Sequence, residues 1–221
     1  MEKREIVTVG VVDDHHLMMD GLKLLVESMD GFRCVWTTDN AADCLARVEA
    51  KPPDMVLVDI TMPDRNGIEL IKDLRKLCPE VKLLVISMHD EEVYAQRALK
   101  AGARGYVMKS ASHDEIRDTL LRVAEGRLGV SDDLSERMVE AFFSGQEASD
   151  RDLVGNLSDR EFEVFQLVGE CKTAAQIGEA LGISSKTVDV YKSKIRGKLD
   201  IKPGDSLAAY AIRWVELKKI G

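Results

Sequence analysis

A short apolar run that ends in an acidic residue is the feature that most constrains how this chain can fold. Val56, Leu57 and Val58 precede Asp59, and Pro63 follows in a turn-like stretch. A run of about four to eight apolar residues bounded by turn signals is typical of a strand buried on both faces. In open α/β sheets, ligands gather at the carboxyl ends of such strands. Asp59 is therefore expected at the working edge of a parallel sheet, although an aspartate that only caps a turn would also fit this segment.

Strand-like and helix-like segments alternate through the first half of the chain. Apolar runs occur at Ile6–Val12, Cys34–Trp36, Met55–Val58, Val81–Ile86 and Tyr106–Met108. Helix-like segments follow them at Leu17–Met29, Ala41–Ala50, Ile68–Leu77, Glu91–Lys100 and Asp114–Ala124. This alternation predicts a doubly wound α/β domain with a parallel five-stranded sheet. Helix starts support it, because Asn66 with Glu69 and Ser112 with Glu115 have the spacing of capping boxes.

Polar residues of complementary kinds follow four of the predicted strands. Asp13 and Asp14 come after the first strand, Asp59 after the third, Ser87 after the fourth and Lys109 after the fifth. Carboxylates that converge repel one another unless a cation joins them, and oxygen ligands suit Mg²⁺. Asp59 could then be a nucleophile that forms an acyl phosphate, with Ser87 and Lys109 contacting the phosphoryl oxygens. Taken singly, the acidic pair could be a helix-capping loop and Lys109 a surface lysine.

Charge is distributed unevenly between the two halves of the chain. The net charge is −8, but residues from Arg151 onward carry 12 Lys/Arg and 10 Asp/Glu, a net of +2, which leaves −10 for the residues before them. An acidic front and a slightly basic back indicate two domains with different partners. No apolar run approaches the roughly 20 residues of a membrane span, and the start of the chain does not resemble a signal peptide. A cytoplasmic protein without membrane contact is expected.

A linker is expected between the two halves, over residues 127–152. Within it, the stretch from Ser131 to Phe143 predicts a short amphipathic helix. Its apolar stripe would consist of Leu134, Met138, Val139 and Phe142. The polar stretch from Ser144 to Asp152 is typical of a connector between domains.

Residues 153–221 show a helical pattern without strands, which predicts an all-α domain of four helices. Ser158 with Glu161 and Thr173 with Gln176 have capping-box spacing. Gly182 allows a tight turn before a longer helix over Ser185–Leu199, so that a helix-turn-helix is expected. Its core-facing side carries Val188, Ile195 and Leu199, and its other side carries Lys186, Lys192, Lys194, Arg196 and Lys198. A basic helix face is usually only solvated, but after a turn of this form it favours binding to the phosphates of DNA.

The first half resembles the receiver domain of two-component response regulators. The resemblance rests on Val11–His15, Asp59–Gly67, Ser87–His89 and Gly105–Lys109, which keep the order and spacing of that family. It implies a flavodoxin-like fold over residues 1–126 and phosphotransfer from a histidine kinase to Asp59. By position, Asp14, Asp59 and the Thr61 carbonyl would bind Mg²⁺, Asp13 would help through water, and Ser87 and Tyr106 would form the switch pair.

Two further expectations for the receiver follow from this resemblance. Thr61 and His89 lie two residues past Asp59 and Ser87, where they would flank the path of the water that hydrolyses the phosphate and so tune its lifetime. Many receivers have a cis proline after the lysine, but Ser110 stands here, which leaves the isomer of the Lys109–Ser110 bond open.

The second half resembles the LuxR-type effector of NarL/FixJ response regulators. The likeness rests on Leu157–Glu161, Glu163–Val164, Ile177, Leu181–Ser184, Lys186–Val188 and Lys198–Leu199. It implies dimers on a two-fold site, with the third helix in the major groove. Asp189, Val190 and Ser193 would face base edges, while Lys186, Thr187, Lys192 and Lys194 would hold phosphates. The chain departs from the family at Cys171, Ala174 and Tyr191, where Gly, Asn and His are usual.

The combined interpretation is a phosphorylation-dependent transcription regulator that is not an enzyme beyond its own phosphotransfer and dephosphorylation. Its expected partners are a sensor histidine kinase, double-stranded DNA and a second copy of itself. One alternative is a DNA-binding regulator whose receiver no longer uses phosphate. Another is a phosphatase with Asp59 as nucleophile; such enzymes need a general acid near the nucleophile, and Thr61, two residues on, cannot serve as one.

Overall fold

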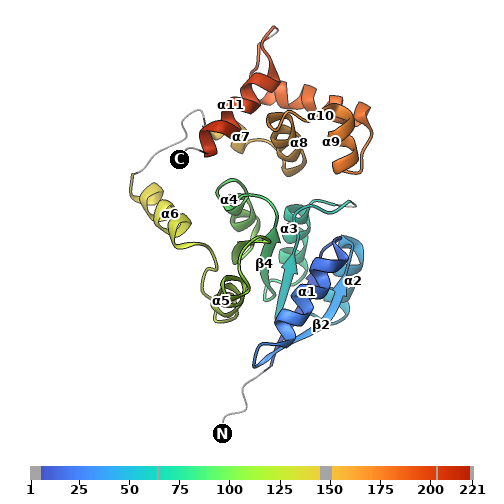
Figure 1. Cartoon of the computed structure of the whole chain (residues 1–221), viewed down its shortest axis with the longest axis vertical. Coiled ribbons are helices and arrows are strands. Elements are labelled where there is room, and N and C mark those ends of the chain that lie inside the picture. Colours follow the sequence, from blue (N-terminus) through green and yellow to red (C-terminus); the bar gives the residue numbers. More distant parts are fainter. Residues whose placement is uncertain (1–5, 64, 145–150, 203, 220–221) are drawn as a thin grey trace. The chain divides into compact units, whose positions relative to one another are not determined.

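The chain folds into two units in the computed structural model, residues 1–138 and 139–221 (Figure 1). The structure describes residues 6–63, 65–144, 151–202 and 204–219. Residues 145–150 of the expected linker lie outside this set. Among the described helices, none combines the length and the apolar character that a bilayer span requires.

The first unit contains a parallel sheet with the strand order β2-β1-β3-β4-β5. Its strands are β1 (Val7–Val12), β2 (Phe32–Thr38), β3 (Met55–Val58), β4 (Lys82–Ser87) and β5 (Gly105–Met108). Helices α1 (His16–Glu27), α2 (Ala41–Ala50), α3 (Gly67–Leu77), α4 (Glu91–Ala101) and α5 (His113–Ala124) connect and follow them. The predicted flavodoxin-like fold is thus confirmed, and the strand order reverses between β1 and β3, where such sheets place their ligands.

Alternation along the strands gives the sheet two buried faces. Val9, Val11 and Leu57 point to one face, where they pack with residues of α1 and α5 in a continuous apolar core. Val56 and Val58 point the opposite way and are also fully buried. Burial on both faces explains why these strands are uninterrupted apolar runs. It leaves the strand ends as the places where polar side chains can gather.

Helix caps hold the loops that follow the strands. The predicted capping box of Ser112 and Glu115 is confirmed. The box predicted for Asn66 and Glu69 is wrong, because the Asn66 side chain accepts a hydrogen bond of 2.7 Å from the amide of Ile68 instead. The following residue must be glycine, since a Cβ on Gly67 would lie 1.9 Å from the carbonyl oxygen of Asp59.

Residues 129–137, which we call the strap, run along the β5 edge and the start of α4. Gly129 pairs with β5, because its carbonyl accepts from the amide of Tyr106 at 2.8 Å and its amide donates to the carbonyl of Arg104 at 2.9 Å. The amide of Ser131 donates to Glu91 at 3.0 Å, and Arg137 forms an ion pair of 2.8 Å with Glu92. The strap thereby ties the start of α6 (Asp132–Ser144) to the first unit.

The apolar stripe predicted for α6 is only partly buried. Leu134 is 5% exposed, as expected for a residue that packs on the first unit, but Val139 is 55% exposed. The side chain of Phe142 is outside the described residues. Of the described side chains of this stripe, Leu134 therefore packs on the first unit, whereas Val139 is largely exposed.

The second unit is helical. It consists of α7 (Arg151–Gly155), α8 (Asp159–Gly169), α9 (Ala174–Ala180), α10 (Ser185–Lys198) and α11 (Leu207–Lys219). The predicted capping boxes at Ser158 and Thr173 are confirmed. Val188, Ile195 and Leu199 are buried as predicted. The predicted helix-turn-helix is formed by α9 and α10, which pack against each other.

An internal ion pair joins α8 to the end of α10. The Lys198 ammonium lies 2.6 Å from a Glu161 carboxylate oxygen, and the same carboxylate accepts from the amide of Ser158 at 2.7 Å. Although burial opposes it, these contacts lower the pKa of Glu161. Lys198 is thus paired within the unit, although its side chain stays partly exposed.

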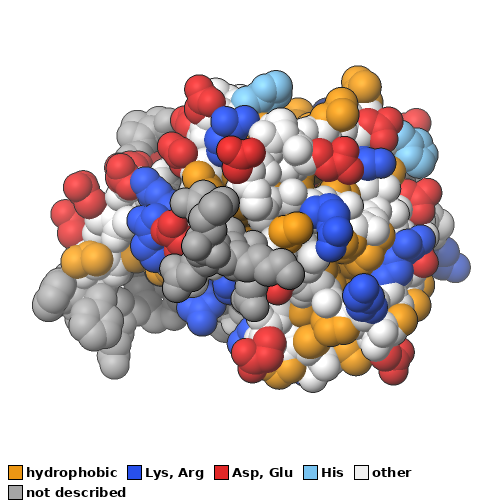
Figure 2. All heavy atoms as spheres, turned by 90° about the horizontal axis from the view of Figure 1, so that it is seen from below, with side chains coloured by type: hydrophobic (Ala, Val, Ile, Leu, Met, Phe, Trp, Pro, Cys, Tyr) orange, Lys and Arg blue, Asp and Glu red, His pale blue; other side chains and the backbone are white. Residues whose placement is uncertain are grey.

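On the face drawn in Figure 2, acidic and basic side chains are interspersed, with hydrophobic side chains in separate groups between them.

Gly67 provides a test of how tightly the loop after β3 is packed. We expect Gly67→Ala to destabilise the first unit by about 1–3 kcal/mol, because the new methyl group overlaps the Asp59 carbonyl. Gly21→Ala is the matched control, since a Cβ there meets nothing within 4 Å and Gly21 lies inside α1. Gly21→Ala should instead stabilise the first unit by about 0.5–1 kcal/mol, because alanine is favoured over glycine inside a helix. Urea unfolding followed by circular dichroism measures both, and equal effects would contradict the packing argument.

Glu161→Gln tests the α8–α10 ion pair. Because the folded-state pKa of Glu161 is lowered, its contribution is present above the unfolded pKa of about 4.3 and is lost as pH falls through the folded value. We expect a loss of about 1 kcal/mol at pH 7, discounted for the partial exposure of Lys198. The difference from wild type should shrink below about pH 4. A difference that stays constant down to pH 3 in urea titrations would refute this assignment.

Candidate functional site

The carboxyl ends of β1, β3 and β5 bring two acids and one lysine together. Asp13 and Asp59 are 1% and 3% exposed, and the Lys109 ammonium lies 2.7 Å from an Asp13 oxygen and 2.8 Å from an Asp59 oxygen. The three side chains were predicted to converge because parallel strands end at one edge of the sheet. The structure places them in direct contact.

The charges at this edge are unbalanced. Burial and the neighbouring Asp13 carboxylate raise the pKa of Asp59 to about 6, and the Lys109 ammonium opposes this rise. Although burial disfavours its charge, the two carboxylates hold the pKa of Lys109 above its usual value. One ammonium therefore faces two buried carboxylates, with Asp14 nearby. Such a surplus of negative charge favours binding of a cation.

Asp14 and His15 complete the acidic cluster. Ligand atoms of Asp13, Asp14, His15 and Asp59 all lie within 4.8 Å of one another. The His15 amide donates to Asp13 at 2.9 Å, and its Nδ1 lies 2.8 Å from an Asp14 oxygen. Three carboxylates form a hard-oxygen donor set that fits Mg²⁺. Sequence reasoning did not single out His15, whose only signal is its place next to the acidic pair.

Ser87, at the end of β4, is fully buried beside this cluster. Its Oγ accepts a hydrogen bond of 3.2 Å from the amide of His89. Tyr106 is 1% exposed, and its hydroxyl donates to the carbonyl of His89 at 2.8 Å. The two residues of the expected switch pair thus both contact the backbone of His89.

The side chain of His89 connects two further segments. Its Nε2 lies 2.8 Å from Thr61 Oγ1, and its ring stacks on the ring of Tyr94 with centroids 4.3 Å apart. Burial and the Lys109 charge lower the pKa of His89 to about 4, so the ring is neutral at pH 7. Tyr94 was missed by sequence reasoning, because a helical tyrosine gives no sign of which ring it meets in the fold. The Lys109–Ser110 peptide bond, left open above, is trans.

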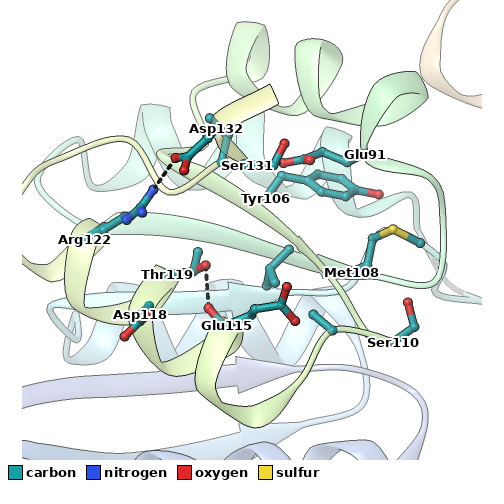
Figure 3. Close-up of a pocket in the computed structure, with 13 residues that line it drawn as sticks. Glu91, Tyr106, Met108, Ser110, Glu115, Asp118, Thr119, Arg122, Ser131 and Asp132 are labelled. Atoms are coloured by element: carbon teal, nitrogen blue, oxygen red, sulfur yellow. Dashed lines mark hydrogen bonds and ion pairs between the residues drawn. The ribbon is translucent and has the colours of Figure 1, made fainter. Parts of the chain in front are cut away.

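A cavity of about 530 Å³ lies behind Tyr106, between α5, β5 and the strap. Figure 3 shows the Tyr106 ring and Met108 on the right of this pocket, and Arg122 and Asp132 on its left. Arg122 and Asp132 are linked by an ion pair of 3.4 Å across the upper rim. The buried Tyr106 therefore lines this cavity, while its hydroxyl is bonded to the carbonyl of His89.

One side of α10 is exposed to solvent over most of the helix. The exposed residues are Lys186, Thr187, Asp189, Val190, Ser193 and Lys194, and Lys192 is half-buried. The Lys194 ammonium lies 5.7 Å from the centre of the Tyr191 ring. At the other end of the helix, Arg196 donates to the carbonyl of Asp205 and Lys198 pairs with Glu161. The residues expected to contact DNA thus lie along α10 from Lys186 to Lys194, and all of them except the half-buried Lys192 are exposed.

The departure from the family at Cys171 has a structural consequence. Cys171 adopts a φ of 61°, in the left-handed region that favours glycine. The backbone conformation that suits the family's usual glycine is therefore kept, although the side chain has changed.

Comparison with known proteins identifies both units. Residues 9–121 match the family model "Response regulator receiver domain", and residues 155–211 match "Bacterial regulatory proteins, luxR family". The response regulator GacA of Pseudomonas aeruginosa is 31% identical over 208 residues, which cover 94% of this chain and 96% of GacA. The transcriptional regulatory protein DegU of Brevibacillus brevis is 31% identical, with 96% of each chain covered.

A solved structure supports the fold. RcsB of Salmonella enterica serovar Typhimurium, bound to promoter rprA in the presence of the phosphomimetic BeF₃⁻, is similar with a TM-score of 0.61 and 21% identity. The match covers 93% of this chain and 98% of RcsB. The chain therefore belongs to the response regulators of the NarL/FixJ type, in which a receiver domain precedes a LuxR-type DNA-binding domain.

Proposed function

We propose that this protein is a transcription regulator whose DNA binding is controlled by phosphorylation of Asp59. The observation that carries the proposal is the convergence of the buried carboxylates of Asp13 and Asp59 on Lys109, next to Ser87. These groups suit phosphotransfer, because they supply a nucleophile, a cation site and donors for the phosphoryl oxygens.

The phosphoryl group would come from a phosphohistidine of a sensor kinase. An Asp59 carboxylate oxygen forms the new P–O bond while the P–N bond to the kinase histidine breaks, which leaves an acyl phosphate on Asp59. Asp14, Asp59 and the carbonyl of Thr61 would hold Mg²⁺, with Asp13 acting through water, and a bound ion would supply positive charge beside the transferred group. The Lys109 ammonium, now paired with Asp59, would contact a phosphoryl oxygen, and the Ser87 hydroxyl would donate to another.

The signal would leave the site through His89. When Ser87 turns toward the phosphoryl group, it gives up its contact with the His89 amide, and Tyr106 loses or moves its own contact with the His89 carbonyl. The strap is bonded to the amide of Tyr106 and to Glu91 and Glu92 of α4. A shift of these elements therefore changes how α6 is held and biases a two-state receiver that gates the DNA-binding unit.

DNA binding would use the exposed side of α10 from Lys186 to Lys194 and two copies of the chain. Lys186, Thr187, Lys192 and Lys194 are proposed to hold phosphates, and Asp189, Val190 and Ser193 to face base edges. Asp189 can accept from the N4 amino group of cytosine, and Val190 can contact a thymine methyl group. A protein that reads chromosomal DNA works in the cytoplasm, and we assign it there.

The two alternatives are a regulator whose receiver does not use phosphate and a phosphatase, and both can be tested. A regulator with an unused receiver need not keep Asp13, Asp14, Asp59, Ser87 and Lys109 together. A phosphatase would need a general acid beside the nucleophile, and Thr61 cannot provide one. Turnover of a generic phosphomonoester such as p-nitrophenyl phosphate would favour the phosphatase instead.

Asp59→Asn tests the phosphoacceptor. We expect one added phosphoryl group on wild type after incubation with acetyl phosphate and Mg²⁺, and none on Asp59→Asn or in the presence of a chelator, as measured by intact mass. Asp20→Asn is the matched control, because Asp20 is exposed on α1, and it should be phosphorylated like wild type. An unmodified wild type that also fails to bind beryllofluoride would support the regulator without phosphate control.

Lys186→Gln tests the proposed DNA interface. We expect weaker binding to a non-specific duplex, with the slope of log K against log salt reduced in magnitude by about 1. The control is Lys23→Gln, which removes the same charge at an exposed position of α1. It should leave the slope of log K against log salt unchanged. Fluorescence anisotropy over a salt series measures both. Equal slopes for the two variants would remove Lys186 from the interface.

A further inference from the structure

His89 is the point at which three elements of the receiver meet. Its ring contacts Thr61 in the loop after β3, and its backbone contacts Ser87 of β4 and Tyr106 of β5. The loop that carries it is short, since α4 begins two residues later at Glu91. Whatever fixes the position of the His89 ring therefore influences the phosphoacceptor loop and the switch tyrosine together.

Tyr94 is the residue that packs on this ring. It lies in the first turn of α4, is 2% exposed, and its ring plane is inclined 23° to that of His89 at a centroid distance of 4.3 Å. Stacked aromatic pairs are attractive beyond the area they bury and restrict the orientation of both rings. The His89 imidazole is thus held from one side by Tyr94, with its Nε2 directed at Thr61.

We propose that Tyr94 is a positioning residue for the lifetime of the acyl phosphate. By stacking on His89, it keeps the imidazole bonded to Thr61, so that the two side chains cover the approach of water to the group on Asp59. Loss of the stack frees the ring, opens this approach and speeds hydrolysis. The proposal rests on phosphorylation of Asp59 and adds a residue outside the site that sets how long the modified state lasts.

The same turn of α4 extends this role to the strap. Glu91 and Glu92 precede Tyr94 by three and two residues and bond to Ser131 and Arg137. A change at the Tyr94–His89 stack and a change at the strap therefore act on one helical turn. The first turn of α4 is in contact with both the phosphorylation site and the segment that leads to the second unit.

The test compares Tyr94→Phe, which keeps the aromatic stack, with Tyr94→Leu, which keeps an apolar side chain but no ring. Each full-length protein is phosphorylated with acetyl phosphate and Mg²⁺, the donor is removed, and the phosphorylated fraction is followed by intact mass. We expect Tyr94→Phe to decay within about twofold of wild type and Tyr94→Leu to decay about threefold to tenfold faster, since loss of an aromatic pair weakens the restraint. Equal decay of Tyr94→Leu and wild type would overturn the proposal.

A second comparison separates positioning from a general loss of packing. In a His89→Ala background the ring is absent, so Tyr94→Leu should cause no further acceleration, whereas a packing defect would accelerate decay in both backgrounds. Equal acceleration with and without the imidazole would overturn the proposal. Tyr94→Met, which fills irregular space, replaces the leucine variant if the latter does not fold.

An NMR measurement keeps failure of the stack distinct from failure of phosphotransfer. The ring current of the residue at position 94 should shift the NMR signals of the His89 ring protons in wild type and Tyr94→Phe. This ring-current shift should be absent in Tyr94→Leu. This readout needs no phosphoryl group. If wild type is not phosphorylated but the ring-current shift is present, the proposed role of Asp59 fails while the stack stands. If the ring-current shift is absent from wild type, the positioning role of Tyr94 fails whatever the state of Asp59.

Discussion

The contact of one ammonium group with two buried carboxylates is the interaction on which the receiver depends. Lys109 joins the ends of β1 and β3 to the end of β5, and none of these charges could be buried alone without a large desolvation cost. Removing the lysine would leave Asp13 and Asp59 facing each other, and removing either acid would leave the lysine partly unpaired. The pairing holds the site together and leaves it with excess negative charge. This excess of negative charge favours binding of a cation. It also suits a phosphoryl group, to which the Lys109 ammonium could transfer its contact.

The contacts around His89 explain how so small a site can affect distant segments. The carbonyl of His89 accepts a hydrogen bond from Tyr106, and its amide donates one to Ser87. Its ring is hydrogen-bonded to Thr61 and stacks on Tyr94. These partners belong to β5, β4, the loop after β3 and α4. Packed elements of this kind move between discrete arrangements rather than deforming gradually. A change in the position of any one partner therefore alters the packing of the others. It also alters the packing of the strap, which is bonded to the edge of β5 and the start of α4.

The parts that could be predicted from sequence are those that follow from topology. Asp13, Asp59, Ser87 and Lys109 each end an apolar strand, and parallel strands end at one edge, so their convergence required no knowledge of distances. The Tyr94–His89 stack could not be predicted in this way, because it depends on how α4 is rotated over the sheet. The box expected at Asn66 failed for a related reason: several nearby amides can be reached by one side chain, and the packing of Gly67 against Asp59 selects among them. Likewise the exposed Val139 shows that an apolar stripe does not reveal where its partner surface stops.

The basic residues of α10 show how one helix divides its charges between folding and binding. Lys198 neutralises Glu161 and Arg196 holds a loop carbonyl, so neither is free in the way that the sequence of the helix suggests. In the proposed function, Lys186, Lys192 and Lys194 would contact phosphates, and the acid at Asp189 would offset part of their charge. Because affinity for DNA rises with the number of phosphates neutralised, a single copy with so few cations would bind weakly. Under the proposed function, pairing two copies on one site would double the contacts, so that control of pairing by the receiver would be sufficient to control DNA binding.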